Sequence, residues 1–117
     1  MSIERFHVGA RLSEASVHQN VVYLAGQIAS DTQADIIGQT REVLASIDRL
    51  LAETNSDKSR LLFVQIFIAD MSEFAHMNQV WDEWVAGIQA PPRATVQALL
   101  ADSRCKVEIV VTAARRD

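Results

Sequence analysis

Hydrophobic positions along the chain follow two spacings, one typical of strands and one typical of helices. The longest apolar run is LLFVQIFIA over residues 61–69, in which Gln65 is the only polar residue. Residues 21–24 (VVYL) and 107–114 (VEIVVTAA) are also rich in β-branched and other apolar side chains, which favour strands. The pattern predicts strands over all three segments, each of them apolar on both faces.

Weaker strand signals lie near the N-terminus and after a Pro-Pro pair. Residues 5–8 are predicted to form a short edge strand and residues 9–15 a polar loop, followed by a turn at Gln19 and Asn20. Residues 94–100 follow the two prolines, which prevent a helix from continuing, and are predicted to form a further strand.

Two segments carry apolar residues at helical spacing. The first helix is predicted to start at residues 31–32, where T-x-x-D has the spacing of a capping box, and to run to about Glu53. The second is predicted to start at Asp70 or Ser72 and to stop at Gly87. Its apolar stripe comprises Phe74, Met77, Trp81, Trp84 and Val85.

The order of these elements predicts the fold class. Two or three strands, a helix, a strand, a helix and two strands indicate an α+β fold, in which a mixed β-sheet carries two helices on one face. Two helices cover only one face of a sheet whose main strands are apolar on both. Because a soluble monomer rarely exposes so large an apolar surface, we expect the other face to be buried against further copies of the chain.

Composition narrows the class of protein. A length of 117 residues fits one domain over residues 1–117, and a net charge of −4 argues against a nucleic-acid surface. The single cysteine, Cys105, cannot form an intrachain disulfide. The N-terminus lacks a signal-peptide core, and no window reaches the ~18 apolar residues that a membrane span needs. We therefore expect a soluble, cytoplasmic protein without a membrane or nucleic-acid partner.

Two charged residues are the main candidates for chemistry. Arg93 follows the Pro-Pro turn, and Glu108 lies inside the apolar run KVEIVVTAA. An arginine offers a planar fork of donors to a carboxylate, and a glutamate serves as a general base or orients a water molecule. The pair suggests a small carboxylate-binding site that works on water. The plainer interpretation, a surface arginine and a glutamate at a wet edge, stays open.

Strand alternation places Arg93, Thr95 and Gln97 on one face of their strand. If the last two strands formed a simple hairpin, Glu108 would lie opposite Gln97 and roughly 13 Å from Arg93, at ~3.4 Å per residue. Either the two strands are not neighbours or a partner chain completes the site. Gly26 interrupts its strand, which marks a bulge or a close approach to the backbone by another group.

Other candidate groups give weaker signals. The histidines lack metal-ligand spacing, and the sequence has no Cys/His cluster, phosphate loop or dinucleotide fingerprint. Cys105 lies in a polar loop without an organised base, which favours a spectator thiol. Trp81 and Trp84 are interpreted as core aromatics rather than a stacking platform. Asn78 either caps a loop or reaches a site.

Three motifs resemble the RidA family, also called YjgF-like. They are VYLAGQ over residues 22–27, FIADMSEFAHMNQVWDEW over residues 67–84, and PPRATV with KVEIVVTAA; the nearest match is the YoaB-like branch. The resemblance covers nearly the whole chain. It implies a chorismate-mutase-like fold, assembly as a homotrimer, and ligand sites in the clefts between subunits. It also places the last strand in the sheet between the strands of residues 21–25 and 61–69. Residues 94–100 then pair with the other edge of the strand at residues 61–69.

RidA-like proteins hydrolyse reactive enamines and imines to 2-keto acids and ammonia, with no metal or cofactor. By resemblance, Arg93 grips the carboxylate of the substrate and Glu108 positions the attacking water. Gly26 lines the site through its backbone, and Asn78 is a cleft asparagine. An imine is already electrophilic, so a held carboxylate and an oriented water suffice for the reaction.

Two positions depart from the family pattern. Leu12 replaces the usual site tyrosine, and Thr95 replaces the usual cysteine two residues after the arginine. Both are expected to shape the pocket for the substrate, whose identity they leave open. A non-catalytic protein that binds a 2-keto acid in the same cleft is therefore the alternative to an imine/enamine deaminase. An RNA-cleaving translation inhibitor is a third hypothesis, which the acidic charge disfavours.

Overall fold

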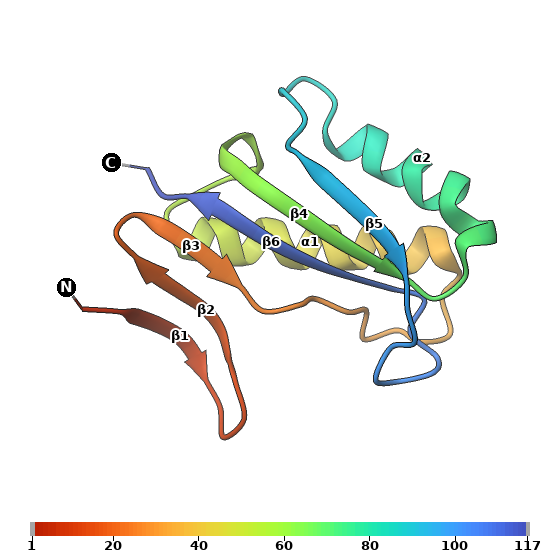
Figure 1. Ribbon diagram of the computed structural model, residues 1–117, viewed down its shortest axis with the longest axis horizontal. Coiled ribbons are helices and arrows are strands. Elements are labelled where there is room, and N and C mark those ends of the chain that lie inside the picture. Colours follow the sequence, from red (N-terminus) through yellow and green to blue (C-terminus); the bar gives the residue numbers. More distant parts are fainter. Residues whose placement is uncertain (1, 117) are drawn as a thin grey trace.

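Six strands form one sheet in the computed structural model, which describes residues 2–116 (Figure 1). They are β1 (Glu4–Val8), β2 (Ser13–His18), β3 (Val21–Leu24), β4 (Leu61–Ile68), β5 (Arg93–Gln97) and β6 (Val107–Ala114). Their order is β1-β2-β3-β6-β4-β5, with β4 and β5 parallel and the other neighbours antiparallel. Residues 1 and 117 of the expected domain lie outside the described residues.

The last strand, β6, lies inside the sheet between β3 and β4, as the family resemblance implied. Its backbone pairs with a strand on either side, so neither edge of β6 is left open to solvent. Val107, Ile109 and Val111 on one face of the strand are buried in the core. The predicted insertion of this strand is confirmed, and it explains why the segment is so apolar.

The N-terminal part of the sheet contains a strand that the sequence pattern placed in a loop. β2 begins inside residues 9–15, so the predicted loop is wrong in its second half. The strand has the sequence SEASVH, in which Ala15 and Val17 are buried, but it contains too few large apolar residues to give a clear signal. The turn at Gln19 and Asn20 is confirmed, with φ angles of 51° and 65° that suit a tight hairpin.

Two α-helices, α1 (Ile36–Glu53) and α2 (Phe74–Trp84), pack beside each other. The end of α1 is confirmed, but its predicted start is wrong. Asp35 rather than Thr32 is the N-cap, because the Asp35 carboxylate accepts a hydrogen bond of 2.9 Å from the Gly38 N–H. The chain before Asp35 forms turns instead of helix.

The approach to α2 and the end of β5 differ slightly from the predictions. A 3₁₀ turn, Met71–Glu73, leads into α2, and the Asp70 side chain caps this turn rather than the α-helix itself. The strand predicted over residues 94–100 ends at Gln97. Its parallel partner β4 ends at Ile68, which pairs with Gln97, so the ladder stops there.

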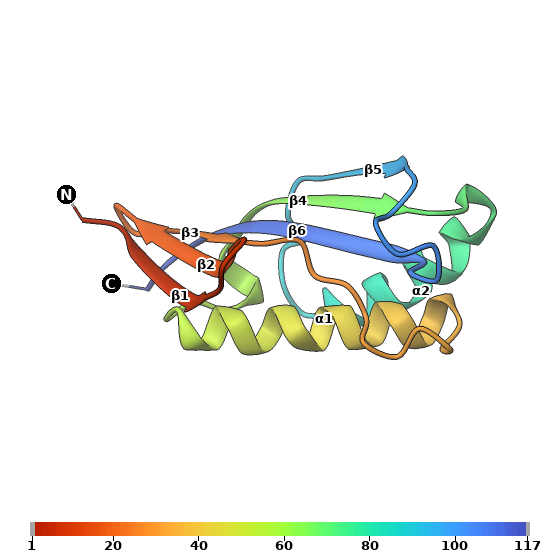
Figure 2. The same ribbon diagram turned by 90° about the horizontal axis from the view of Figure 1, so that it is seen from below.

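Both helices cover the same face of the sheet, and the other face is open (Figure 2). The covered face holds the core, whose largest buried side chains include Leu44, Ile47, Leu51, Ile66, Ile68, Met77 and Ile109. The open face carries large apolar side chains, among them Tyr23, Phe63 and Val96, which are 48%, 43% and 43% exposed. The predicted α+β sheet with two helices on one face is confirmed. Burial of the open face against other copies stays a prediction.

Candidate functional site

Arg93 is the first residue of β5, and its side chain lies against α2. Its register partner on β4, Val64, belongs to the buried face of the sheet. The Arg93 Nη1 donates a hydrogen bond of 2.8 Å to Oδ1 of Asn78. The Cζ atom lies 5.2 Å from the ring centroid of Trp81 and 5.7 Å from that of Phe74. Three side chains of one helix therefore hold the guanidinium.

The guanidinium of Arg93 is partly buried but has no anionic partner among the residues that the structure describes. None of the ion pairs among residues 2–116 includes Arg93. Burial lowers the pKa of Arg93, and the more distant charge of Asp82 opposes that shift. An arginine stays protonated even so, because its ordinary pKa is above ~12. A partly desolvated cation with a neutral partner is suited to receive an anion from outside the chain.

Thr95 lies two residues further along β5 on the same face as Arg93, as the alternation predicted. Its Oγ1 is buried and has no hydrogen-bond partner within the described part of the chain. Buried hydroxyls are nearly always paired, so this hydroxyl is an exception within the described part of the chain. Gln97, next on the same face, is already used, because its Oε1 accepts a hydrogen bond of 2.8 Å from the Met71 N–H.

Glu108 lies on the open face of β6, directly against Gly26. A Cβ atom added at Gly26 would fall 2.0 Å from Oε2 and 2.9 Å from Cδ of Glu108. The carboxylate therefore occupies the space that any other residue at position 26 would need. Gly26 marks a close approach to the backbone, one of the two interpretations that the sequence left open.

Gln27 fixes the segment that carries Gly26. Its N–H donates to the carbonyl of Ile109 at 2.9 Å, and its carbonyl accepts from the Ile109 N–H at 3.1 Å. The buried side-chain amide of Gln27 donates to a backbone carbonyl at 3.0 Å and to the Glu14 carboxylate at 3.2 Å. Because Ile109 follows Glu108 directly, this pairing holds Gly26 beside the carboxylate.

Arg93 and Glu108 do not meet within one chain. Arg93 pairs with Val64 and Glu108 with Phe67, so the two lie on either side of β4 and three residues apart along it. At ~3.3 Å per residue and ~4.8 Å per strand, their Cα atoms are roughly 14 Å apart. Arg93 faces the helices and Glu108 faces the open side, so the side chains point away from each other.

Leu12 is also distant from Arg93. It lies in the loop between β1 and β2, at the edge of the sheet opposite to β5, and is 57% exposed. The candidate residues therefore form two groups within one chain. Arg93, Asn78 and Thr95 lie at the β5 edge, whereas Gly26 and Glu108 lie together on the open face.

Comparison with known proteins gives a consistent family assignment. Residues 2–115 match the family described as Endoribonuclease L-PSP. A RutC family protein of Haemophilus influenzae is 52% identical over 114 residues, which are 97% of this chain and 98% of that protein. A crystal structure of a YjgF family member from Neisseria meningitidis is 43% identical, with a TM-score of 0.96 over 100% of this chain and 98% of the other. The chain belongs to the YjgF/RidA family.

The likeness to the YoaB-like branch is also confirmed. RutC family protein YoaB of Escherichia coli is 43% identical over 114 residues, covering 97% of this chain and 99% of that protein. The names of these three family members state no activity, and the fold alone does not determine the function of this YjgF/RidA protein.

Three residues of this YjgF/RidA protein were not assigned to a site from the sequence. Phe74 and Trp81 lie at helical spacing on the face of α2 that carries Asn78, and Trp81 was interpreted as a core residue only. Trp81 is indeed buried, but one of its neighbours is the guanidinium of Arg93. Gln27 ends the motif VYLAGQ, which was its signal in the sequence, and the structure adds that its side chain is buried.

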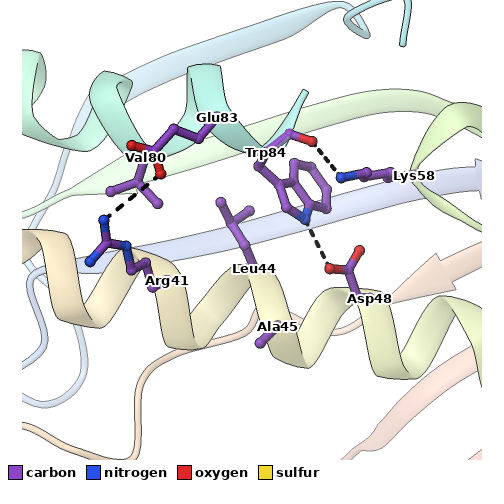
Figure 3. A pocket seen from close by; sticks show the side chains of 8 residues that line it. All are labelled: Arg41, Leu44, Ala45, Asp48, Lys58, Val80, Glu83 and Trp84. Carbon is purple, nitrogen blue, oxygen red and sulfur yellow. Dashed lines mark hydrogen bonds and ion pairs between the residues drawn. The ribbon is translucent and has the colours of Figure 1, made fainter. Parts of the chain in front are cut away.

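A separate groove of about 290 Å³ lies between α1 and α2 (Figure 3). Leu44, Val80 and Trp84 supply apolar lining. Its polar groups pair with one another: Trp84 Nε1 donates to Asp48 at 3.0 Å, and Lys58 Nζ donates to the Trp84 carbonyl at 2.6 Å. The bond to Asp48 ties the end of α2 to α1, which is a structural role.

Residues 2–116 contain no group of three or more side chains that could hold a metal ion, and neither α-helix among them is long and apolar enough to cross a membrane. Burial raises the pKa of the Cys105 thiol, which disfavours the reactive thiolate. This favours the interpretation of Cys105 as a spectator.

Proposed function

We propose that this protein hydrolyses reactive 2-imino acids and their enamines to 2-keto acids and ammonia. The observation that carries the proposal is the state of Arg93. It is a partly buried cation whose hydrogen-bond partner, Asn78, is neutral, and none of the ion pairs in residues 2–116 involves it. A carboxylate on the substrate supplies the missing counter-charge.

Glu108 supplies the second half of the reaction. Its carboxylate binds a water molecule and takes a proton from it as the oxygen attacks the imine carbon. Glu108 passes this proton to the imine nitrogen, which gives a neutral carbinolamine. The hydroxyl proton of the carbinolamine then moves to the amine nitrogen, and ammonia leaves as the C–N bond breaks and the C=O bond forms. The imine carbon is electrophilic from the start, so positioning contributes most of the acceleration and no cofactor is required.

We further propose that each active site is shared between two subunits of a homotrimer. Arg93 at the β5 edge of one chain would face Glu108 and Gly26 of the next, with Leu12 of that next chain closing the pocket. Support comes from the opposed faces of Arg93 and Glu108 within one chain and from the exposed Leu12. A contact between different edges of two copies is head-to-tail, and such contacts form a closed ring when the rotation between copies closes.

A second candidate is a non-catalytic protein that binds 2-keto acids in the same cleft. It is favoured by the fact that Arg93 and Asn78 already form a carboxylate-binding group within one chain, whereas Glu108 of the same chain faces the other side of the sheet. It predicts saturable binding of 2-oxobutanoate without release of ammonia from any imine.

RNA cleavage, which the description of the matched family names, has less support in this chain. The net charge is −4, and several surface arginines already face carboxylates. These pairs are Arg41–Glu83, Arg104–Asp102, Arg115–Glu4 and Arg116–Asp57. Phosphate binding depends on clustered and available cations. We expect neither salt-dependent RNA binding nor RNA cleavage above that of a mock preparation.

A coupled assay tests the deaminase proposal. A serine or threonine dehydratase generates the imine, and release of the 2-keto acid is followed with wild-type protein and with Arg93→Ala. We expect the wild type to accelerate release and Arg93→Ala to lose about 100-fold or more, since losing one partner of a desolvated charge pair costs roughly 2–5 kcal/mol. Absence of acceleration by correctly assembled wild-type protein would contradict the proposal and favour the binding protein.

A further inference from the structure

The three α2 side chains around Arg93 form a defined arrangement. We infer that Asn78, Phe74 and Trp81 are positioning residues that fix the plane of the Arg93 guanidinium and leave its Nε–Nη2 edge for the substrate carboxylate. The inference rests on the proposed function for the identity of the substrate. The ordering of Arg93, by contrast, is a property of the protein without ligand.

The contacts restrict the guanidinium in two ways. Asn78 holds Nη1 at 2.8 Å, which fixes rotation within the plane of the group. The rings of Trp81 and Phe74, 5.2 Å and 5.7 Å from Cζ, restrict movement out of that position. An arginine that is ordered before binding loses less conformational freedom when the ligand arrives.

The donors that remain define the recognition edge. Nη1 is engaged by Asn78, whereas Nε and Nη2 make no hydrogen bond to any residue within 2–116. Nε and Nη2 lie on one side of the planar group and match the two oxygens of a carboxylate. The Nε–Nη2 edge is therefore the edge of the guanidinium on which neither nitrogen is engaged within residues 2–116, and it suits a side-on, bidentate contact with a monocarboxylate.

An uncharged amide at position 78 suits this role better than a carboxylate would. An aspartate would hold Nη1 equally well but would neutralise Arg93 and compete with the substrate. The amide oxygen of Asn78 orients the guanidinium and leaves its positive charge available. Asn78 is thus suited to orienting the cation without replacing its ligand.

Trp81 is itself held in place. It is only 5% exposed, and its ring centroid lies 5.5 Å from that of Trp84, tilted by 49°. Trp84 donates its indole N–H to Asp48 on α1, as Figure 3 shows. The aromatic wall beside Arg93 is therefore connected to the longer helix and does not depend on the ligand.

Kinetics of matched variants test the positioning role. Asn78→Asp keeps the size of the side chain and is expected to raise KM for the imine about 100-fold, whereas Asn78→Ala should raise it about tenfold through loss of one charged hydrogen bond. Trp81→Phe keeps an aromatic face and should stay within about threefold of wild type, whereas Trp81→Leu should raise KM about tenfold. kcat should change less than KM throughout. Gln79→Ala, at the exposed neighbouring position on α2, is the control.

A spectroscopic readout makes the test independent of activity. In ¹⁵N-labelled wild-type protein without ligand, hindered rotation about Nε–Cζ should give separate Nη1 and Nη2 signals for Arg93 at low temperature. Asn78→Ala and Trp81→Leu should merge these signals, and Arg93→Lys assigns them. Circular dichroism and sedimentation confirm that each variant is folded and assembled as the wild type is.

The outcomes separate this inference from the proposed function. Averaged Arg93 signals in the wild type, or unchanged KM in Asn78→Asp and Trp81→Leu, would overturn the inference even if the wild type hydrolyses imines. Resolved signals that depend on Asn78 and Trp81 support the ordering of Arg93. If they are found in a protein that neither binds 2-oxobutanoate nor hydrolyses imines, the proposed function is overturned instead.

Discussion

Gly26 and Glu108, 82 positions apart in the sequence, are in such close contact that no side chain fits between them: a Cβ on Gly26 would lie 2.0 Å from the carboxylate oxygen Oε2. The contact depends on the backbone pairing of Gln27 with Ile109, the residues that follow each of them. It places one carboxylate at a fixed position on the open face of the sheet.

Gly26→Ala should therefore reduce activity much more than stability. The atoms nearest to the added methyl group belong to the flexible Glu108 side chain, which can move away. We expect a change in the free energy of unfolding of about 1 kcal/mol or less, and a fall in kcat of about 100-fold because the water is no longer oriented. Urea denaturation and imine turnover measure the two effects.

The double variant Gly26→Ala with Glu108→Ala is the control for that prediction. Once the carboxylate is gone, the methyl group at position 26 should cause no further loss of activity. Additive losses in the double variant would show that Gly26 acts independently of Glu108.

The open face of the sheet should be the assembly surface. Phe63 is 43% exposed there, and Phe63→Asp would place a charge in an apolar interface. We expect sedimentation to show a trimer for the wild type and a monomer for the variant, with loss of imine turnover. Ala52→Glu adds the same charge at an exposed position of α1 and should leave the trimer intact. A monomeric wild type would contradict the shared site.

Asp57 should stabilise the fold only in its ionised form. A hydrogen bond from the Ser59 hydroxyl, aided by Arg116, lowers the pKa of Asp57 from its ordinary value of 3.8. Because the folded-state pKa is the lower one, the contribution is present above pH ~4 and is lost as the pH falls through the folded value.

The variant Asp57→Asn isolates this charge effect, since asparagine also caps helical turns. At pH 7 the free energy of unfolding should fall by about 1 kcal/mol or less, because the site is partly exposed. The difference from the wild type should shrink as the pH falls below about 4 and disappear once the folded-state carboxylate is protonated. A difference that persists or grows at low pH, measured by chemical denaturation, would contradict the role assigned to the charge.

The hydrogen bond from Trp84 to Asp48 should contribute modestly to stability. Asp48→Ala removes this 3.0 Å contact between α2 and α1, and we expect the free energy of unfolding to fall by about 1 kcal/mol. Asp82→Ala removes a similar exposed carboxylate that makes no hydrogen bond or ion pair within residues 2–116, and serves as the control. Equal melting temperatures for the two variants would show that the contact carries no stability.

Much of the fold was predictable because its strongest signals are local. The runs that became β4 and β6 have enough β-branched residues to be read directly, and the helical stripe of α2 is equally clear. β2 was missed in part because its inward residues, Ala15 and Val17, are small. The start of α1 was misplaced because Thr32 and Asp35 are both suitable N-cap residues. The hydrogen bond from the Gly38 N–H shows that Asp35 is the cap.

The site was less predictable because it depends on register. Sequence alternation placed Arg93 and Thr95 on one face, but it could not say that this face meets α2. The contact between Gly26 and Glu108 requires β6 to lie beside the segment after β3, which the residues alone do not determine. The role of Trp81 was hidden because a ring that packs in the core gives the same helical spacing as a ring that also touches a cation.

The central claim is that Arg93 and Glu108 of one active site come from different chains, and subunit mixing tests it most directly. Arg93→Ala and Glu108→Gln are each inactive as pure trimers in this account. When the two variants are refolded together in equal amounts, random assembly gives about a quarter of the sites both an intact Arg93 and an intact Glu108. The mixture should therefore regain about a quarter of wild-type imine turnover. A mixture no more active than its separate parents, although mixed trimers form, would contradict the shared site.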